Sequence, residues 1–225
     1  MARYIGPVCR LCRREGVKMF LKADRCNGKC PMDKEAVPPG QHGHARASKP
    51  TEYGKRLREK QKARRFTGVL ERQFRRMFET ASRTKGNTGE TLLRMLETRL
   101  DNVVRRLGFS QSPSGARQLV CHGHVSVNGR RVDVASYQTK PGDVIAVSEG
   151  LKANAFLRHS LDVQVQKGLP VWLEWDPGLP EVVKKSRDAA SLEGAVLSGK
   201  VKQWPTRAEM SFPVNEQFIV ELYSK

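Results

Sequence analysis

Four of the five cysteines of the chain fall within residues 9–30, in two closely spaced pairs. Two residues separate Cys9 from Cys12, thirteen residues follow, and three residues separate Cys26 from Cys30. Two such pairs joined by a short arm are typical of a structural zinc site, because each pair can present two thiolates to one ion across a tight turn. The pattern therefore predicts one structural Zn²⁺ ion, bound by these four cysteines and without a catalytic role.

Other interpretations of these thiols stay open at this point. They could be unliganded or redox-active, and His42 and His44, in a loop rich in proline and glycine, could substitute as ligands. Residues 1–45 contain few large apolar side chains, so zinc binding, worth on the order of 10–16 kcal/mol in finger peptides, would supply the folding free energy of this segment. Cys121 stands alone in an apolar helical pattern and is expected to pack in the core.

The charge of the chain is strongly unbalanced. It has 41 Lys and Arg against 23 Asp and Glu, a formal net charge of +18, and residues 1–80 alone hold 21 basic and 8 acidic side chains. Self-repulsion on this scale predicts a polyanionic partner, for which phosphate backbones fit better than an anionic membrane surface. No window approaches the ~18 apolar residues of a membrane span, and no secretory signal is recognisable, so we expect a cytoplasmic protein.

The basic part of the chain continues into predicted helices. Residues 37–50, rich in proline and glycine, are expected to form an extended linker. Residues 51–65 should be helical, but with little beyond Tyr53 and Leu57 to bury, this helix is expected not to pack deeply on protein. It is therefore either a solvated surface helix or, because it carries seven basic residues between Lys55 and Arg65, a nucleic-acid contact.

Two further helices are expected from apolar periodicity. The first should bury one side and end at residues 85–89, because its apolar residues recur at spacings of four, three, one and three. These residues are Leu70, Phe74, Met77, Phe78 and Ala81. The second extends as one helix from Leu93 to Leu107, with Gly108 as its stop and an ion pair between Asp101 and Arg105 at i+4.

Residues 112–147 predict a shorter helix followed by a small sheet. Ser112 and Pro113 should begin the helix, and Gly123 should end it. Asn128-Gly129, between two runs of alternating valines, predicts a hairpin because both turn positions tolerate positive φ. A third strand is expected through residues 144–147.

The predicted fold class is α+β, with four parts. They are a zinc-binding basic segment (1–45), a basic helical domain (46–90), a helix–helix–sheet module (91–150) and a helix and strands that complete the second domain (151–225). The closing stretch "PVNEQFIVELYSK" is expected to be a strand.

Several of these stretches resemble one family. The run "RLDNVVRRLGF", with "ARQLVCHGHVSVNGRRVDV" and "KPGDVIAV", is similar to the small RNA-binding domain named after the fourth protein of the small ribosomal subunit. The stretches "MARYIGPVCRLCRREG", "PPGQHG", "RLREKQKARR" and "PVNEQF" resemble the bacterial S-four family of ribosomal proteins. Together they cover most of residues 1–147 and the C-terminus.

The resemblance implies a structural constituent of the small ribosomal subunit, with no enzymatic activity, no small-molecule substrate and no membrane contact. Members are primary binders of small-subunit ribosomal RNA that nucleate assembly of the 5′ domain and contribute to translational accuracy. They neighbour the third and fifth small-subunit proteins, and many carry a zinc knuckle whose pattern the four paired cysteines match. Their RNA-binding module is inserted, so the C-terminal strand should return to the first domain.

The expected RNA contacts are basic side chains and a few polar neighbours, because Arg and Lys supply most of the affinity for phosphates. In the first half of the chain they are Arg10, Arg13, Arg14, Lys55, Arg56, Arg58, Lys62, Arg64, Arg65, Arg72, Arg75 and Arg76. In the small module they are Arg117, His122, His124, Asn128, Arg130 and Arg131. The helix after Ser112 has only one basic residue, and Cys121 stands where the family commonly has another. We therefore expect the first half of the chain to contribute more of the RNA binding.

Two rival functions need features that the sequence does not offer. An RNA-modifying enzyme would need a large catalytic body, and the chain has no Walker A motif, no G-x-G-x-x-G and no serine elbow. A zinc-containing DNA-binding regulator would be expected to carry a recognition helix with base-reading polar residues.

Overall fold

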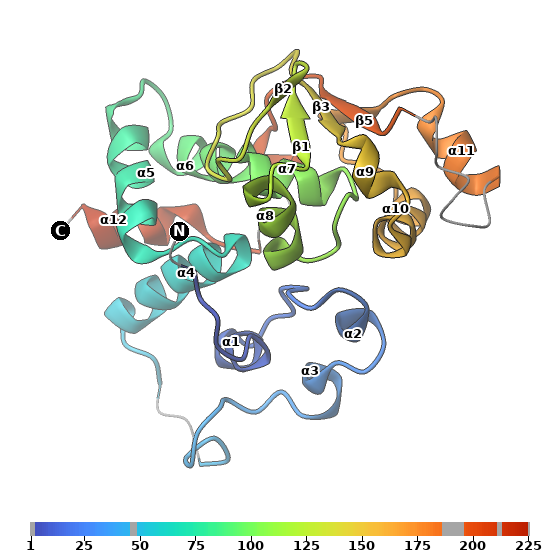
Figure 1. Ribbon diagram of the computed structural model, residues 1–225. Helices are drawn as coiled ribbons and strands as arrows, with labels where there is room; N and C mark the ends of the chain where they lie inside the picture. The colour runs from blue at the N-terminus through green and yellow to red at the C-terminus, as the bar shows by residue number, and fades with distance from the viewer. Residues whose placement is uncertain (1–2, 46–48, 186–195, 211–212, 225) are drawn as a thin grey trace. The chain divides into compact units, whose positions relative to one another are not determined.

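The computed structural model describes residues 3–45, 49–185, 196–210 and 213–224 (Figure 1). The chain divides into two compact units, one made of residues 1–93 with 211–225, the other of residues 94–210. Helices and an antiparallel sheet are both present, which confirms the α+β class. Among the described helices, none has the length and hydropathy that a bilayer-spanning segment requires.

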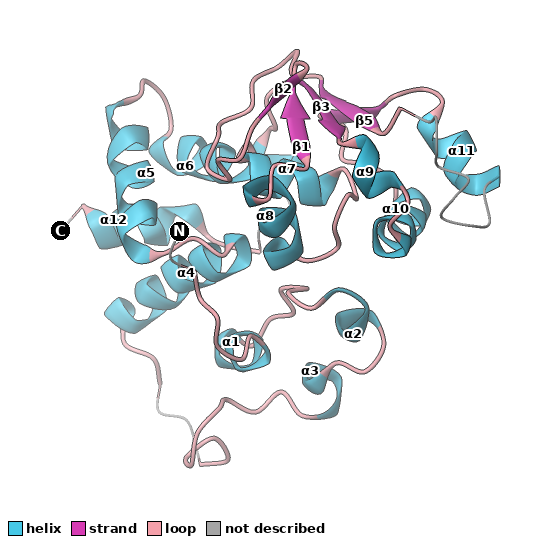
Figure 2. Ribbon diagram, viewed as in Figure 1, coloured by secondary structure: helices cyan, strands magenta, loops and turns pink. Residues whose placement is uncertain are grey.

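The described part of the first unit is built from helices (Figure 2). Helix α6 begins in this unit and ends in the other. The bounds are Cys9–Glu15 (α1), Ala23–Asn27 (α2), Pro31–Lys34 (α3), Glu52–Thr67 (α4), Glu71–Arg83 (α5), Thr88–Glu97 (α6) and Glu216–Tyr223 (α12).

The charged helix α4 forms where the sequence predicted it, but it is packed more deeply than expected. Thr51 caps it by accepting a hydrogen bond from the backbone N–H of Gly54 at 3.1 Å, and Gly68 ends it with φ of +69°. Ala63 and Phe66 are buried, and α12 lies against the helix. The prediction that α4 could not pack deeply is wrong, because its basic side chains find carboxylate partners within the protein and its apolar residues cluster near its end.

The apolar stripe predicted for α5 is confirmed: Phe74, Met77, Phe78 and Ala81 are all buried. Leu70 immediately precedes the helix and is half-buried. The break expected at residues 85–89 is also present, because α5 ends at Arg83 and α6 begins at Thr88.

The expected C-terminal strand is instead a helix, α12. Asn215 caps it by accepting a hydrogen bond from the backbone N–H of Gln217 at 3.0 Å, and Ile219 is fully buried. Ile219 and Tyr223 lie four residues apart and therefore share one side of a helix. Helix α12 belongs to the first unit, so the chain returns to that unit after the second one.

Tyr223 anchors α12 to the rest of the first unit. Its ring stacks on Phe78 and Phe74, with centroids 4.7 Å and 6.2 Å apart, and its hydroxyl donates to Glu71 Oε1 at 2.8 Å. Lys60 also donates to Glu71, at 2.6 Å. Burial raises the pKa of Tyr223, and the hydrogen bond to Glu71 raises it further, so the hydroxyl stays protonated.

Replacing Tyr223 with phenylalanine should lower the free energy of unfolding by about 1.5–3 kcal/mol, because the hydrogen bond to a charged acceptor is lost while the stacking is kept. Urea denaturation monitored by circular dichroism would measure the change. The matched control is Tyr53→Phe, at an exposed tyrosine of α4. Equal stabilities of the two variants would contradict the role of the hydroxyl.

The second unit contains a five-stranded antiparallel sheet within its described residues, in the order β2-β1-β3-β5-β4. Its strands are Val125–Val127 (β1), Arg130–Arg131 (β2), Val144–Val147 (β3), Leu173–Trp175 (β4) and Ser198–Val201 (β5). Its helices are Leu100–Arg106 (α7), Pro113–Cys121 (α8), Glu149–Lys152 (α9), Ala155–Lys167 (α10) and Leu179–Lys185 (α11), and a 3-10 helix spans Arg207–Glu209.

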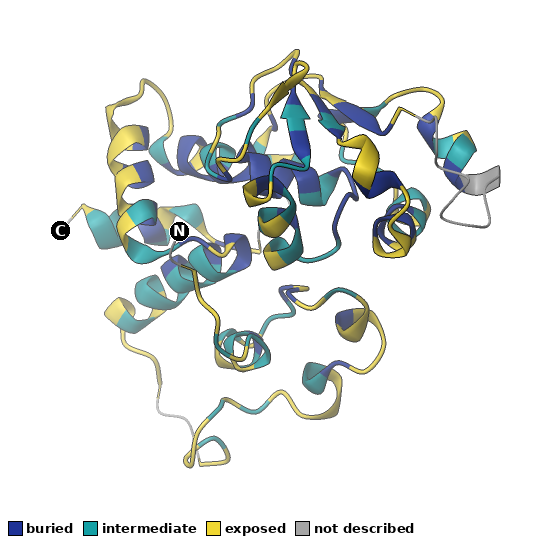
Figure 3. Cartoon of the chain, in the orientation of Figure 1, coloured by how far each residue is buried: buried dark blue, intermediate teal, exposed yellow. Residues whose placement is uncertain are grey.

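The sheet extends beyond the module predicted at residues 91–150. Strand β5 pairs with β3, with Ile145 opposite Gly199, and β4 pairs with β5. Gly199 is required at this position, since a Cβ there would collide with the side chain of Leu107. Residues after 150 therefore complete the sheet, and buried residues from both parts share one core (Figure 3).

The single helix expected from Leu93 to Leu107 is broken into α6 and α7. Between them Arg99 is extended, with ψ of 138°, and forms an isolated bridge with Gln138. Asp101 forms ion pairs with Arg99 at 2.8 Å and with Arg117 at 3.3 Å. An ion pair between Asp101 and Arg105 stays a prediction.

The helix at residues 113–121 and the hairpin after it are confirmed. Ser112 Oγ accepts from the N–H of Gly115 at 3.1 Å, and Asn128 and Gly129 have φ of +52° and +76°. Cys121 is exposed at the end of α8, so the prediction that it packs in the core is wrong.

Candidate RNA interface and cysteine pocket

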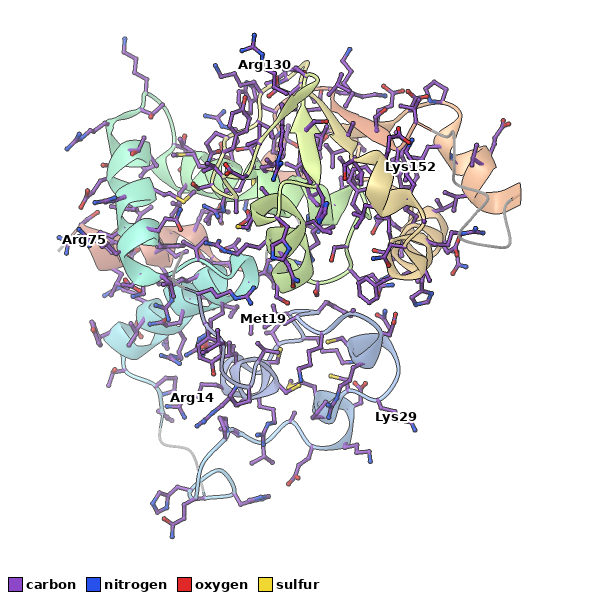
Figure 4. All side chains as sticks on the ribbon, viewed as in Figure 1. Arg14, Met19, Lys29, Arg75, Arg130 and Lys152 are labelled. Atoms are coloured by element: carbon purple, nitrogen blue, oxygen red, sulfur yellow. The ribbon has the colours of Figure 1, made fainter. Side chains whose placement is uncertain are left out.

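The four paired cysteines line one small pocket in the first unit. Cys12, Cys26 and Cys30 are each 7% exposed, and Cys9 is half-buried. Cys9 and Cys12 come from α1, Cys26 from α2, and Cys30 precedes α3. Sulfur atoms, yellow in Figure 4, lie among these three helices. The fold thus gathers into one place thiols that lie up to 21 positions apart in sequence.

The donor set and its location fit zinc, although the thiol positions do not form a coordination shell. Within the described residues, no group of three or more His, Cys, Asp or Glu side chains is positioned to hold a metal ion. Burial raises the pKa of the Cys12 thiol, and the other three cysteines raise it further. Four thiols that line one pocket are the donor type that Zn²⁺ prefers.

The two alternative histidine ligands lie on the surface. His42 and His44 are exposed, and His44 Nε2 lies 3.4 Å from a carboxylate oxygen of Glu35. Neither histidine lines the cysteine pocket.

The predicted contacts around the cysteines are available for binding. Arg10 and Arg14 are exposed and Arg13 is half-buried. None of these arginines forms an ion pair in the part of the chain that the structure describes. Lys29, labelled in Figure 4, is another exposed cation of this segment. An unpaired surface cation can bind a phosphate without first breaking an internal ion pair.

The predicted contacts on α4 are engaged differently, since each has a carboxylate partner within the protein. Arg56 binds Glu221 at 2.6 Å, and Arg64 binds Glu71 at 3.3 Å. The remaining pairs are Lys55 with Glu52, Lys62 with Glu59, and Arg58 and Arg65 with Glu15. The helix therefore uses much of its charge to join neighbouring segments.

Glu15 is the centre of this network, and the sequence analysis did not single it out. Its side chain is 0% exposed and accepts from Arg58 at 3.2 Å and from Arg65. Burial raises the pKa of Glu15, and the two arginines oppose that rise. Because Glu15 ends α1, this carboxylate ties the cysteine segment to α4. An acidic residue within a basic stretch is the only signal that the sequence offered.

On α5, Arg72 and Arg76 are exposed and form no ion pair among the described residues, whereas Arg75 lies 3.3 Å from Glu79. Arg75 is labelled in Figure 4. Arg83 and Lys85, at the end of this helix, are also exposed cations and were not among the predicted contacts. Helix α5 thus buries its apolar stripe and presents arginines on the opposite side.

In the second unit, two predicted contacts have structural roles instead. Arg117 is 11% exposed and holds the buried carboxylate of Asp101. Asn128 donates to Asp143 at 2.9 Å, and its Oδ1 accepts from the N–H of Val144 at 2.9 Å. Both side chains therefore take part in stabilising the fold of the second unit.

The other predicted contacts of this unit lie near its surface. Arg130 and Arg131 are exposed on β2, and Arg130 projects from the hairpin in Figure 4. His122 is exposed and His124 is half-buried, with ring centroids 6.2 Å apart. Arg131 Nη2 donates to the carbonyl oxygen of His122 at 3.3 Å, which joins the hairpin to the turn after α8.

Comparison with known families covers both units. Residues 3–97 match the family described as ribosomal protein S4/S9 N-terminal domain, and residues 98–145 match the S4 domain. The two matches together span more than half of the chain.

Curated relatives are similar over the whole length. The small ribosomal subunit protein uS4 of Thermus thermophilus is 50% identical over 226 aligned residues, which cover 100% of this chain and 100% of its own. The uS4 protein of Natranaerobius thermophilus is 53% identical with the same coverage, and uS4A of Symbiobacterium thermophilum is 52% identical.

Proposed function

This chain belongs to the uS4 family of small ribosomal subunit proteins, and we propose that it is a structural protein of that subunit which binds ribosomal RNA. The observation that carries this proposal is the full-length identity of about half of all positions to curated uS4 proteins. A formal net charge of +18 supports it, because phosphates would neutralise the self-repulsion. The role is structural and not enzymatic.

Sedimentation tests the proposal directly. The purified protein should bind a transcript of the small-subunit ribosomal RNA and co-sediment with small subunits reconstituted from parts that lack it. Binding to duplex DNA of the same length should be weaker at equal salt. Preference for DNA would favour a zinc-containing regulator, and turnover of structured RNA would favour a modifying enzyme.

The phosphate contacts that we propose are chiefly the cations that form no ion pair with another described residue. In the first unit these are Arg10, Arg13, Arg14, Arg72 and Arg76, and in the second Arg130 and Arg131. The paired cations of α4 would contribute to the positive field while they hold the fold. Structured RNA is recognised largely through shape and phosphate geometry, which suits arginines presented by rigid helices.

The double variant Arg72→Gln, Arg76→Gln should weaken binding to the transcript and reduce the slope of log affinity against log salt by about 2, or about 1 for each lost phosphate contact. Filter binding across a salt series measures the slope. A control with the same loss of charge is Lys167→Gln, Lys200→Gln, at two exposed lysines of the second unit. Equal slopes for both double variants would remove Arg72 and Arg76 from the interface.

We also propose that Cys9, Cys12, Cys26 and Cys30 bind one structural Zn²⁺ ion. Their shared pocket and the thiol donor set support this assignment. When bound, zinc would hold four thiolates. It would favour the deprotonated form of Cys12, which metal binding requires, and so oppose the rise that burial causes in the pKa of this thiol. Glu15 would then connect the zinc-bound segment to α4, which would keep Arg10, Arg13 and Arg14 in place.

The finer assignments follow the family resemblance. We propose that the protein binds ribosomal RNA early in assembly of the 5′ domain, lies beside the third and fifth small-subunit proteins, and contributes to decoding accuracy. On this proposal it works in the cytoplasm, bound to the ribosome. Small subunits reconstituted with and without the third and fifth proteins would test this proposal of neighbours. Crosslinks from this protein to each of them should form only in subunits that contain that protein.

A further inference from the structure

The second unit has a surface pocket beside α8 that none of the assignments above explains. The pocket lies between α8, the turn at residues 122–124 and the start of α10. Phe109, Leu151 and Leu157, all buried in the core of this unit, form its apolar floor. The hollow is therefore supported by packed helices and not by a loop alone.

Three aromatic rings are among the residues that line this pocket. His122 and His124 line it with ring centroids 6.2 Å apart and planes tilted by 42°. Phe156, in the first turn of α10, also lines it and is 57% exposed. Asn154 accepts a hydrogen bond from the N–H of Phe156 at 2.8 Å, which fixes the backbone that carries this ring. Flat rings around an apolar hollow favour a flat ligand.

The polar groups of the pocket can read the edge of a heterocycle. Gln118 is exposed on α8 and offers both a donor and an acceptor. Asn154 uses Oδ1 for the N–H of Phe156, so its amide NH₂ can donate. The residues that line the pocket include no carboxylate, so an approaching polyanion meets no like charge there.

A cation stands next to the aromatic side of the pocket. Arg131 donates to the carbonyl oxygen of His122, and a Cβ at Gly123 would collide with its guanidinium. Gly123 therefore lets Arg131 lie close to the turn that carries both histidines. A pocket lined by aromatic rings beside a guanidinium can accept one nucleotide, with its base in the pocket and its phosphate on the arginine.

We propose that this pocket accepts one unstacked base of the RNA that the protein binds. The proposal rests on the proposed function, since the RNA is the ligand in both. Sequence-specific RNA recognition commonly uses bases splayed out of loops and stacked on aromatic side chains. An apolar side chain of a neighbouring protein would fill the floor, but it would offer no hydrogen-bonding partner to the amides of Gln118 and Asn154 and no charge to the neighbouring Arg131, whereas a nucleotide offers both.

The test replaces Phe156 with alanine and measures binding to a transcript of the small-subunit ribosomal RNA. Loss of one stacked base should weaken binding about 5- to 100-fold, and the salt slope should stay unchanged because no charge is removed. Chemical probing of base reactivity should reveal one nucleotide that the wild-type protein protects and the variant does not. His122→Ala, at an exposed side chain, should expose the same nucleotide.

The matched control is Tyr137→Ala, at an exposed aromatic residue of the same unit that does not line the pocket. If Phe156→Ala binds as tightly as Tyr137→Ala and the reactivity profiles are identical, the base pocket is wrong while RNA binding stands. If the wild-type protein fails to bind the transcript, the proposed function fails with it. If Phe156→Ala keeps its affinity for RNA but loses contact with a neighbouring protein, the base pocket is wrong and the pocket binds a protein side chain instead.

Discussion

Replacing Cys12 with serine is expected to remove bound zinc and unfold the segment around it. Cys12 lies inside the pocket that the paired cysteines share, and a serine hydroxyl is a much weaker zinc ligand than a thiolate. Zinc binding contributes on the order of 10–16 kcal/mol in finger peptides, and this segment buries little else besides Met19 and Leu21. Metal analysis should fall from about one equivalent to nearly none, and amide hydrogen exchange in residues 3–45 should accelerate.

Cys121→Ser provides the matched control. It makes the same chemical change at an exposed cysteine of the second unit. This variant should keep its zinc and its pattern of amide exchange, and a chelator added to it should reproduce the behaviour of Cys12→Ser. The four-thiolate assignment would be contradicted if the wild-type protein is purified without any zinc, or if the Cys12→Ser variant keeps a full equivalent of zinc.

Removal of the buried carboxylate of Glu15 should have the second largest effect. Glu15→Ala is expected to lower the free energy of unfolding by about 3–5 kcal/mol, because Arg58 and Arg65 then face each other without a counter-charge. Arg65 is only 18% exposed, so water can compensate it only in part. Urea denaturation of the variant and of the wild-type protein in the same buffer measures the loss.

Glu35→Ala serves as its control, since that carboxylate is 61% exposed and pairs with the exposed His44. It should change stability by less than about 0.5 kcal/mol. The combination Glu15→Ala, Arg65→Met should cost less than the sum of its parts, because the first change has already left Arg65 without its partner. A loss below about 1 kcal/mol for Glu15→Ala, or strictly additive costs, would show that the buried pair does not join α1 to α4.

Local patterns were sufficient for helices α4, α5 and α8 and for the hairpin. Ser112 caps α8 as its side chain predicted, and the stripe of α5 is buried as its spacing predicted. Asn128-Gly129 forms the turn that its positive φ values require. These features depend on groups a few residues apart, so the sequence contains their physical cause.

Local sequence patterns were insufficient where a short segment can form either a helix or an extended strand. The last residues were predicted as a strand, but Ile219 and Tyr223 lie on one side of a helix that packs against α4 and α5. Within the run from Leu93 to Leu107, Arg99 leaves the helix to bridge Gln138. In both cases a partner far away in sequence decided the conformation, which local propensity cannot reveal.

By itself, the sequence determined the family, the α+β class, the four-cysteine pattern and the excess of positive charge. Only the tertiary structure decided which cations remain available. Most of those of α4, and Arg117, are held by Glu15, Glu71, Glu221 and Asp101, whereas Arg72 and Arg76 form no ion pair with any residue that the structure describes. The reason is that an ion pair depends on distance in space, and carboxylates up to 165 positions away in the chain are brought within about 3 Å by folding.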